Sequence, residues 1–82
     1  MTESQLAALL VDALNAAATR EAGAETALVS VNMDMLAPAA SGAIEVALER
    51  KTRTLVFMRA EARDAAGERI ATASSVHKVL TA

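Results

Sequence analysis

Cysteine, tryptophan and tyrosine are absent from this chain of 82 residues, and phenylalanine occurs only once. Without cysteine the chain forms no disulfide and offers no thiolate metal ligand, which fits a reducing compartment. The formal net charge is −2 at pH 7, without a block of like charges. Because nucleic-acid binding usually combines a basic patch with aromatic side chains that stack on bases, this composition argues against a nucleic-acid partner.

Long hydrophobic runs are missing as well. The apolar stretch at residues 6–11 ends at Asp12, has no Lys or Arg before it, and is far too short to span a bilayer. The single histidine, His77, is interpreted as a surface or packing residue of the last predicted strand, so neither a catalytic histidine pair nor a metal site is expected. We therefore expect a cytoplasmic protein with no membrane partner, no metal and no cofactor.

The length indicates one domain, residues 1–82, near the lower limit for a chain that supports its own core. Hydrophobic residues make up 54% of the chain, but many of them are alanine, which buries little area. Since such a small domain leaves much of its surface unburied, a partner subunit is a natural supplement to the core.

A helix is predicted first, from Ser4 and Gln5 to a stop at Gly23. Residues at helical spacing form a broad apolar face, namely Leu6, Leu9, Leu10, Ala13, Leu14 and Ala17. A narrow polar flank, formed by Asp12, Asn15 and Thr19, is expected to face a cleft or solvent.

Four strands are predicted after Gly23, where the pattern changes to a period of two. They cover "TALVSVNMDM", "AIEVALER", "TLVFMRAEAR" and "ERIATASSVHKVL". In the first strand one face is expected to carry Ala27, Val29, Val31, Met33 and Met35, with the two methionines in the core or in a subunit contact. Residues 64–67 form a hairpin turn, because Asp64 can bond its own backbone and Gly67 can adopt a positive φ. The predicted class is α+β, with one helix and a four-stranded antiparallel sheet.

The order of these elements resembles a known family. The likeness is carried by "NMDMLAPA" at the end of the first strand, "RKTRTLVF" around the basic turn and "DAAGERIATASS" in the final hairpin. Together they resemble the hotdog-fold acyl-CoA thioesterases related to phenylacetyl-CoA thioesterase, over residues 5–80. Two features depart from that family: the strand that usually precedes the helix has no counterpart, and Glu3, Ser4 and Gln5 stand where the family has His-Gly-Gly.

The resemblance implies that the sheet wraps around the helix and that the last strand lies near the middle of the sheet. Small residues in that strand, Ala71, Ala73 and Ser75, would then let the backbone approach the helix closely. An unrelated α+β fold with the same order of elements is the alternative.

The resemblance also assigns a role to Asp12, which matches by its place in the helix the acidic residue that serves as general base or nucleophile towards the thioester. Ser4 and Gln5 would belong to a helix N-terminus that holds the oxyanion, and Asn15 would line the same flank. The alternative for Asp12 is a solvated helix carboxylate, and the alternative for Asn15 is a structural role.

Three cations, Arg50, Lys51 and Arg53, cluster at a turn where related proteins meet the phosphates of CoA. A solvated turn is the alternative for this cluster. At the level of function the leading hypothesis is hydrolysis of an acyl- or aryl-CoA thioester. The alternative is a non-catalytic hotdog module that binds acyl-CoA or serves as an assembly domain, which the replacement of His-Gly-Gly favours.

Assembly follows from the strand order that the resemblance implies, because both edges of the sheet would be unpaired. The edge at Thr26–Met35 carries Val29, Val31, Met33 and Met35 with one charge, which protects it poorly against association. Residues 43–51, at the other edge, carry several charges. We therefore expect a homodimer, or a dimer of dimers, in which the Thr26–Met35 strands pair across a two-fold axis.

Overall fold

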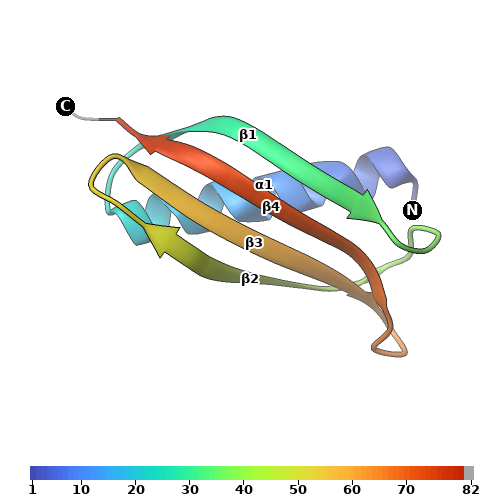
Figure 1. Cartoon of the computed structure of the whole chain (residues 1–82). Coiled ribbons are helices and arrows are strands. Elements are labelled where there is room, and N and C mark those ends of the chain that lie inside the picture. Colours follow the sequence, from blue (N-terminus) through green and yellow to red (C-terminus); the bar gives the residue numbers. More distant parts are fainter. Residues whose placement is uncertain (81–82) are drawn as a thin grey trace.

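The computed structural model describes residues 1–80, which form one helix and four strands (Figure 1). The helix α1 spans Glu3–Ala22, and the strands are β1 (Thr26–Met35), β2 (Gly42–Lys51), β3 (Leu55–Asp64) and β4 (Arg69–Val79). The strands make one antiparallel sheet in the order β1-β4-β3-β2, and α1 lies along one face of it. The predicted class, the element order and the inner position of β4 are confirmed.

Local signals explain the ends of α1. Thr2 is the N-cap, and it forms a capping box with Gln5 in which each side chain bonds the other residue's main-chain N–H. At the other end Gly23 adopts φ 66° and donates to the Thr19 carbonyl, so the helix stops where the sequence predicts. Within residues 1–80, no helix is both long and apolar enough to cross a membrane.

The hairpin between β3 and β4 is also set locally. The Asp64 carboxylate accepts hydrogen bonds from the main-chain N–H groups of Ala66 and Glu68, at 3.0 and 2.9 Å, and Gly67 adopts φ 84°. This is the Asp-to-Gly turn expected from the sequence.

The core lies between α1 and the helix-facing sides of β3 and β4. It contains few large side chains and many alanines: Leu6, Leu10, Leu14, Ala17, Ala18, Val56, Met58, Ala60, Ala62, Ile70, Ala71 and Ala73. Met33 and Met35 pack half-buried against its rim. Ala71, Ala73 and Ser75 are all buried on β4, in agreement with the close approach of this strand to the helix.

Two sequence predictions about which residues face the core are wrong. Leu9, expected on the buried face of the helix, is 45% exposed, while Ala18, which was not in the expected set, is fully buried. In β1 a bulge between Leu28 and Ser30 interrupts the alternation, so Leu28 pairs with buried His77 and Val29 is 60% exposed. The hydrophobic periodicity of one segment predicts neither of these differences in exposure, because the packing of neighbouring elements determines which of its residues are buried.

Candidate functional site

The polar flank of α1 faces the β1 side of the molecule. The hydroxyl groups of Thr19 and Thr26 lie 3.0 Å apart, which ties the end of this flank to the start of β1. Asp12 is exposed, and Asn15 beside it is half-buried. Asp12 has no ion-pair partner within residues 1–80. Its carboxylate therefore stands free beside the open edge strand of the sheet.

The helix N-terminus is partly closed by its own cap. Gln5 donates its main-chain N–H to the Thr2 hydroxyl and accepts the Thr2 N–H on its side chain, so Gln5 is committed to the capping box. The main-chain N–H groups of Glu3 and Ser4 have no acceptor among the described residues. An open hollow of about 610 Å³ adjoins Glu3 and is lined by residues 1–3 and 35–39. This end can present two N–H groups to an oxyanion or another anion.

Asp12 and the free N–H groups of Ser4 and Glu3 are far apart within one chain. At a rise of 1.5 Å per residue, the eight residues from Ser4 to Asp12 separate them by about 12 Å along the helix axis. One small carbonyl group cannot contact both. A single protomer thus holds two parts of a thioester site without bringing them together.

The basic turn is divided by the fold. Lys51 donates from Nζ to the main-chain carbonyl of Glu21 at 2.9 Å, so it caps the C-terminal end of α1. The Arg50 guanidinium lies 5.7 Å from the ring centroid of Phe57, on the opposite side of the sheet, where it makes a cation–π contact. Arg53 is exposed in the turn between β2 and β3. The structure therefore places the side chains of Lys51 and Arg50 on opposite sides of the sheet, although the two residues are adjacent in the chain.

His77 is fully buried on the helix-facing side of β4. Its Nε2 lies 2.7 Å from the Ser75 hydroxyl, and its Nδ1 has no partner within residues 1–80. Burial lowers the pKa of the imidazole, since the charged form would lose its hydration. The interpretation of His77 as a packing residue is consistent with this burial. Among the described residues no group of three or more possible metal ligands is found.

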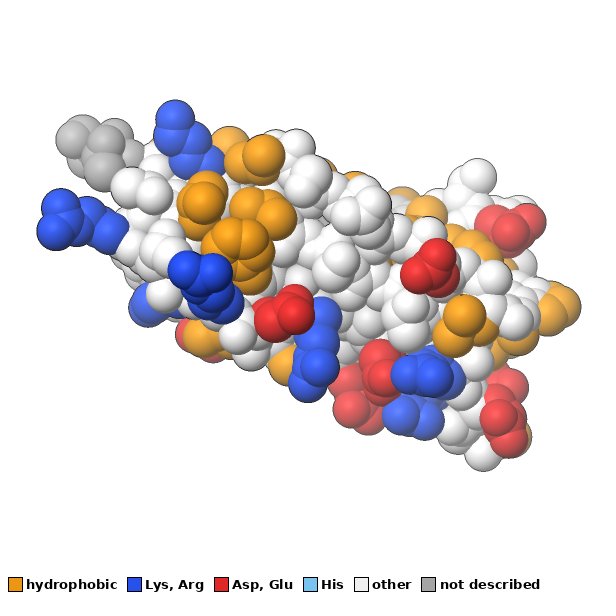
Figure 2. All heavy atoms as spheres, in the orientation of Figure 1, with side chains coloured by type: hydrophobic (Ala, Val, Ile, Leu, Met, Phe, Trp, Pro, Cys, Tyr) orange, Lys and Arg blue, Asp and Glu red, His pale blue; other side chains and the backbone are white. Residues whose placement is uncertain are grey.

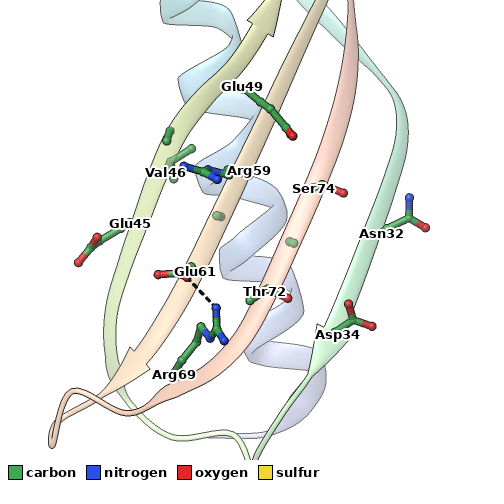
Figure 3. A pocket seen from close by; sticks show the side chains of 13 residues that line it. Asn32, Asp34, Glu45, Val46, Glu49, Arg59, Glu61, Arg69, Thr72 and Ser74 are labelled. Atoms are coloured by element: carbon green, nitrogen blue, oxygen red, sulfur yellow. Dashed lines mark hydrogen bonds and ion pairs between the residues drawn. The ribbon is translucent and has the colours of Figure 1, made fainter.

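Sequence reasoning missed a second hollow, on the sheet face opposite α1 (Figure 3). It has a volume of about 470 Å³ and is lined by alternate residues from all four strands, among them Asn32, Asp34, Glu45, Arg59, Glu61, Arg69, Thr72 and Ser74. Glu61 accepts hydrogen bonds from Arg69 at 3.2 Å and from Arg63 at 3.0 Å, and these contacts lower the pKa of its carboxyl. The alternating polar positions were visible in the sequence, but the strand register that aligns them was not.

Comparisons with known proteins agree with the fold. The BH2602 protein from Bacillus halodurans, crystallised with CoA, matches with a TM-score of 0.85 at 16% identity, over 94% of this chain and 54% of that one. AziG from S. sahachiroi matches with a TM-score of 0.81 at 26% identity, over 92% of this chain and 65% of that one. The chain thus spans about half the length of BH2602. No family model and no curated protein sequence matches it. The fold is hotdog-like.

Proposed function

We propose that this chain binds a CoA thioester and hydrolyses it, with Asp12 as general base or nucleophile. The observation that carries the proposal is the structural likeness to a protein crystallised with CoA. Asp12 supports it further, because its carboxylate is exposed beside the open β1 edge without an ion-pair partner among the described residues. Such a carboxylate can orient and deprotonate a water molecule or attack the thioester carbonyl directly.

Under this proposal the site is completed by a second copy of the chain. Asp12 and Ser4 are about 12 Å apart in one helix, so the oxyanion donors must come from the other protomer. Two antiparallel helices bring Asp12 of one copy next to Ser4 of the other when their two-fold axis passes near Ala8, midway between these residues. Ala8 is small and exposed, which permits a close approach of the helices. The free N–H groups of Glu3 and Ser4 would then hold the oxyanion.

The remaining candidate residues have different parts in this proposal. Arg53, exposed and without an ion-pair partner among the described residues, is the strongest candidate for a CoA phosphate, and Arg50 lies on the neighbouring strand end. Lys51 would have to leave the Glu21 carbonyl to take part. Asn15 lines the flank of Asp12, and Gln5 would contribute through the cap that it forms with Thr2.

A second candidate function is CoA-thioester binding or assembly without hydrolysis. The capping box favours it, because the Gln5 side chain is folded back onto Thr2 at the end of the helix where a thioester carbonyl would have to approach. No glycine among residues 3–5 opens this end of the helix.

The experiment that separates these functions measures thiol release from short, long and aromatic acyl-CoAs, together with CoA binding by calorimetry. We expect Asp12→Asn to lower kcat by about 100-fold or more while CoA binding persists, because the variant keeps its shape and loses the base. Glu25→Gln is the matched control, since Glu25 is exposed and outside the helix. Unchanged turnover in Asp12→Asn rejects the role of Asp12. Binding without turnover in the wild type supports CoA-thioester binding without hydrolysis. Absence of both binding and turnover rejects hydrolysis and CoA binding together and leaves assembly as the function.

The phosphate contact has its own test. CoA should bind more weakly as salt rises, and Arg53→Ala should weaken it further, because exposed charge pairs are screened by ions. Dephospho-CoA should bind less tightly than CoA to the wild type. Arg20→Ala, at an exposed site on the helix, is the control with the same loss of charge. Binding that is independent of salt and of Arg53 would mean that the turn is only solvated.

A further inference from the structure

His77 and Ser75 form a buried polar pair on the helix-facing side of β4, and the proposed function does not use this pair. The imidazole Nε2 lies 2.7 Å from the Ser75 hydroxyl, and both residues are almost completely buried. The other ring nitrogen, Nδ1, has no hydrogen-bond partner among residues 1–80. With its single proton on Nε2, a neutral imidazole leaves Nδ1 as an unbonded acceptor, whereas a protonated ring carries an N–H donor on both nitrogens. The described residues offer no acceptor for that second N–H.

Neighbouring elements enclose the imidazole on the side towards the centre of the sheet. Val56, its partner on β3, is fully buried. Lys51 lies opposite Val56 on β2 and bonds the main-chain carbonyl of Glu21, so the last turn of α1 lies beside this row of residues. The preceding turn of α1 contributes two buried alanines, Ala17 and Ala18. Water therefore does not reach the ring from β3 or from α1.

Only a thin cover separates the imidazole from water on the β1 side. Leu28 pairs with His77 on this edge strand, yet it remains 40% exposed. The bulge follows Leu28 directly, and Val29 there is 60% exposed. Within residues 1–80, β1 pairs with β4 alone. The ring is therefore hydrated most readily when Leu28 moves away from β4.

The bulge divides β1 into two segments of unequal length. The first segment, Thr26–Leu28, pairs with His77–Val79, and the second segment, Ser30–Met35, pairs with Ala71–Val76. Because the ladder is interrupted between them, the first segment can separate from β4 while the second stays paired. Such a local opening costs far less free energy than unfolding of the whole sheet.

Few other contacts hold the first segment. The Thr26 hydroxyl lies 3.0 Å from that of Thr19 on α1, in an exposed position where water can replace either partner. Just before the segment, the Glu25 carbonyl accepts a hydrogen bond from the Leu80 N–H at 2.9 Å. The cover that Leu28 forms over the neutral imidazole therefore contributes much of what holds the segment closed.

We propose that His77 is a pH-sensitive switch for the first segment of β1. While the ring is neutral, the segment covers it. When the ring takes up a proton, the first segment leaves β4, the charged ring reaches water, and the bulge serves as the hinge. Opening also breaks the contact between Thr26 and Thr19, which ties the polar flank of α1 to the sheet. The switch does not depend on hydrolysis of a thioester.

No carboxylate pairs with the imidazole among the described residues. The charged groups around it are Lys51 in the same row, Arg20 and Glu21 in the last turn of α1, Glu25 before β1, and Lys78 on the opposite side of β4. Figure 2 shows Lys and Arg side chains gathered at the end of the molecule where β4 finishes. Burial lowers the pKa of the closed ring below 6.5, whereas contact with water restores the ordinary pKa in the open form.

The pH dependence of the opening follows from these two pKa values. Between pH 6.5 and the lower pKa of the closed ring, the open form binds the proton and the closed form does not. Each pH unit of acidification should then raise the ratio of open to closed molecules about tenfold. Above pH 6.5 both rings are neutral, and the ratio should no longer change with pH.

The decisive experiment is amide hydrogen exchange of the full chain between pH 7 and pH 5, corrected for intrinsic exchange rates. The amides that join residues 25–28 to β4 should lose about tenfold of their protection per pH unit below 6.5. Low concentrations of urea should not change this exchange, because opening of so few residues exposes little surface. In His77→Gln the loss should disappear, since glutamine takes up no proton. An equal loss in His77→Gln, or a loss that grows with urea as it does in the other strands, would overturn the proposal.

Titration of the imidazole by NMR gives an independent test, because the single histidine gives one ring signal. The wild-type midpoint should lie below 6.5, and Leu28→Ala should move it up towards 6.5, because the variant thins the cover of the ring. Leu48→Ala is the matched control: Leu48 is also 40% exposed, and it precedes the bulge of the other edge strand, β2. The control should leave the midpoint unchanged. Equal midpoints in the two variants would show that Leu28 is not the cover, and the proposed switch would be rejected.

Discussion

Ala71 and Ala73 on the helix-facing side of β4 are buried almost completely, and their size allows this inner strand to lie close to α1. Ala60 and Ala62 repeat the pattern on β3. A core of this kind gains little free energy per residue from apolar burial, because each methyl group removes little area from water. Individual polar residues inside it therefore matter more than they would in a core of large side chains.

His77 is the residue for which burial has the clearest consequence. It pairs with Leu28 on β1 and with Val56 on β3, so its cross-strand neighbours are apolar. Burial lowers the pKa of the folded-state imidazole below the ordinary value of 6.5. Below pH 6.5 the unfolded chain therefore binds a proton that the folded chain does not, and the folded state loses stability as pH falls.

We predict that the free energy of unfolding is nearly independent of pH just above 6.5 and falls below it, by at most about 1.4 kcal/mol per pH unit. His77→Gln keeps a hydrogen-bonding group beside Ser75 but cannot take up the proton, so the decline between pH 6.5 and the carboxylate range should disappear. Urea unfolding at one fixed protein concentration measures this. Since the chain has a single histidine, an equal decline in the variant would contradict the assignment.

At the scale of elements, α1 depends on its two ends. Thr2 and Gln5 satisfy each other's main-chain N–H groups at the start, and Gly23 closes the last turn with its positive φ. At the C-terminal end Lys51 adds a contact from β2 to the Glu21 carbonyl. Thr2 and Gln5, which cap the start of α1, therefore lie next to the free main-chain N–H groups of Glu3 and Ser4 in the candidate site.

We predict that Thr2→Ala lowers the free energy of unfolding by about 1 kcal/mol, because it leaves the Gln5 N–H without its acceptor and breaks the reciprocal bond. Thr54→Ala is the matched control, since Thr54 is exposed and its hydroxyl makes no hydrogen bond among the described residues. Urea unfolding measures both variants. Equal stability of the two would show that the cap contributes nothing to the folded state.

At the scale of the whole molecule, the sheet formed within residues 1–80 ends in β1 and β2, each of which pairs with a neighbouring strand on one side only. Leu28 and Val29 on β1 are exposed, and Val31 is half-buried at the rim of the core. Asp34 is the only charge on that strand, whereas β2 carries Glu and Lys or Arg side chains and a bulge. This difference makes β1 the edge that should pair with a second copy.

We predict that the wild type shows no stable monomer at micromolar concentration and that Val31→Lys dissociates and largely unfolds it, because the charge would have to be buried at the paired edge. Val46→Lys places the same charge at a half-buried position of β2 and should remain associated. Sedimentation and circular dichroism measure the two effects. A folded wild-type monomer at low concentration would reject both the β1 dimer and the shared site.

The helix, the four strands and the final hairpin could be predicted because their signals are local. Gly23 and Gly67 adopt positive φ, Asp64 bonds its own turn, and these contacts need only a few neighbouring residues. The order of the elements then indicated a hotdog-like fold, with β4 inside the sheet. The free position of Asp12 on the polar flank also followed from helical spacing alone.

Only the tertiary structure determined which side chains face the core and which come together, because both depend on how the helix and strands are aligned with one another. The bulge in β1 reversed the facing of Val29, and the packing of α1 left Leu9 exposed. The sheet placed Arg50 and Lys51 on opposite sides, although they are adjacent in the chain. It also gathered Glu61, Arg63 and Arg69 beside the hollow on the sheet face opposite α1. Register across four strands is a property of pairs of segments, so no single segment of sequence contains it.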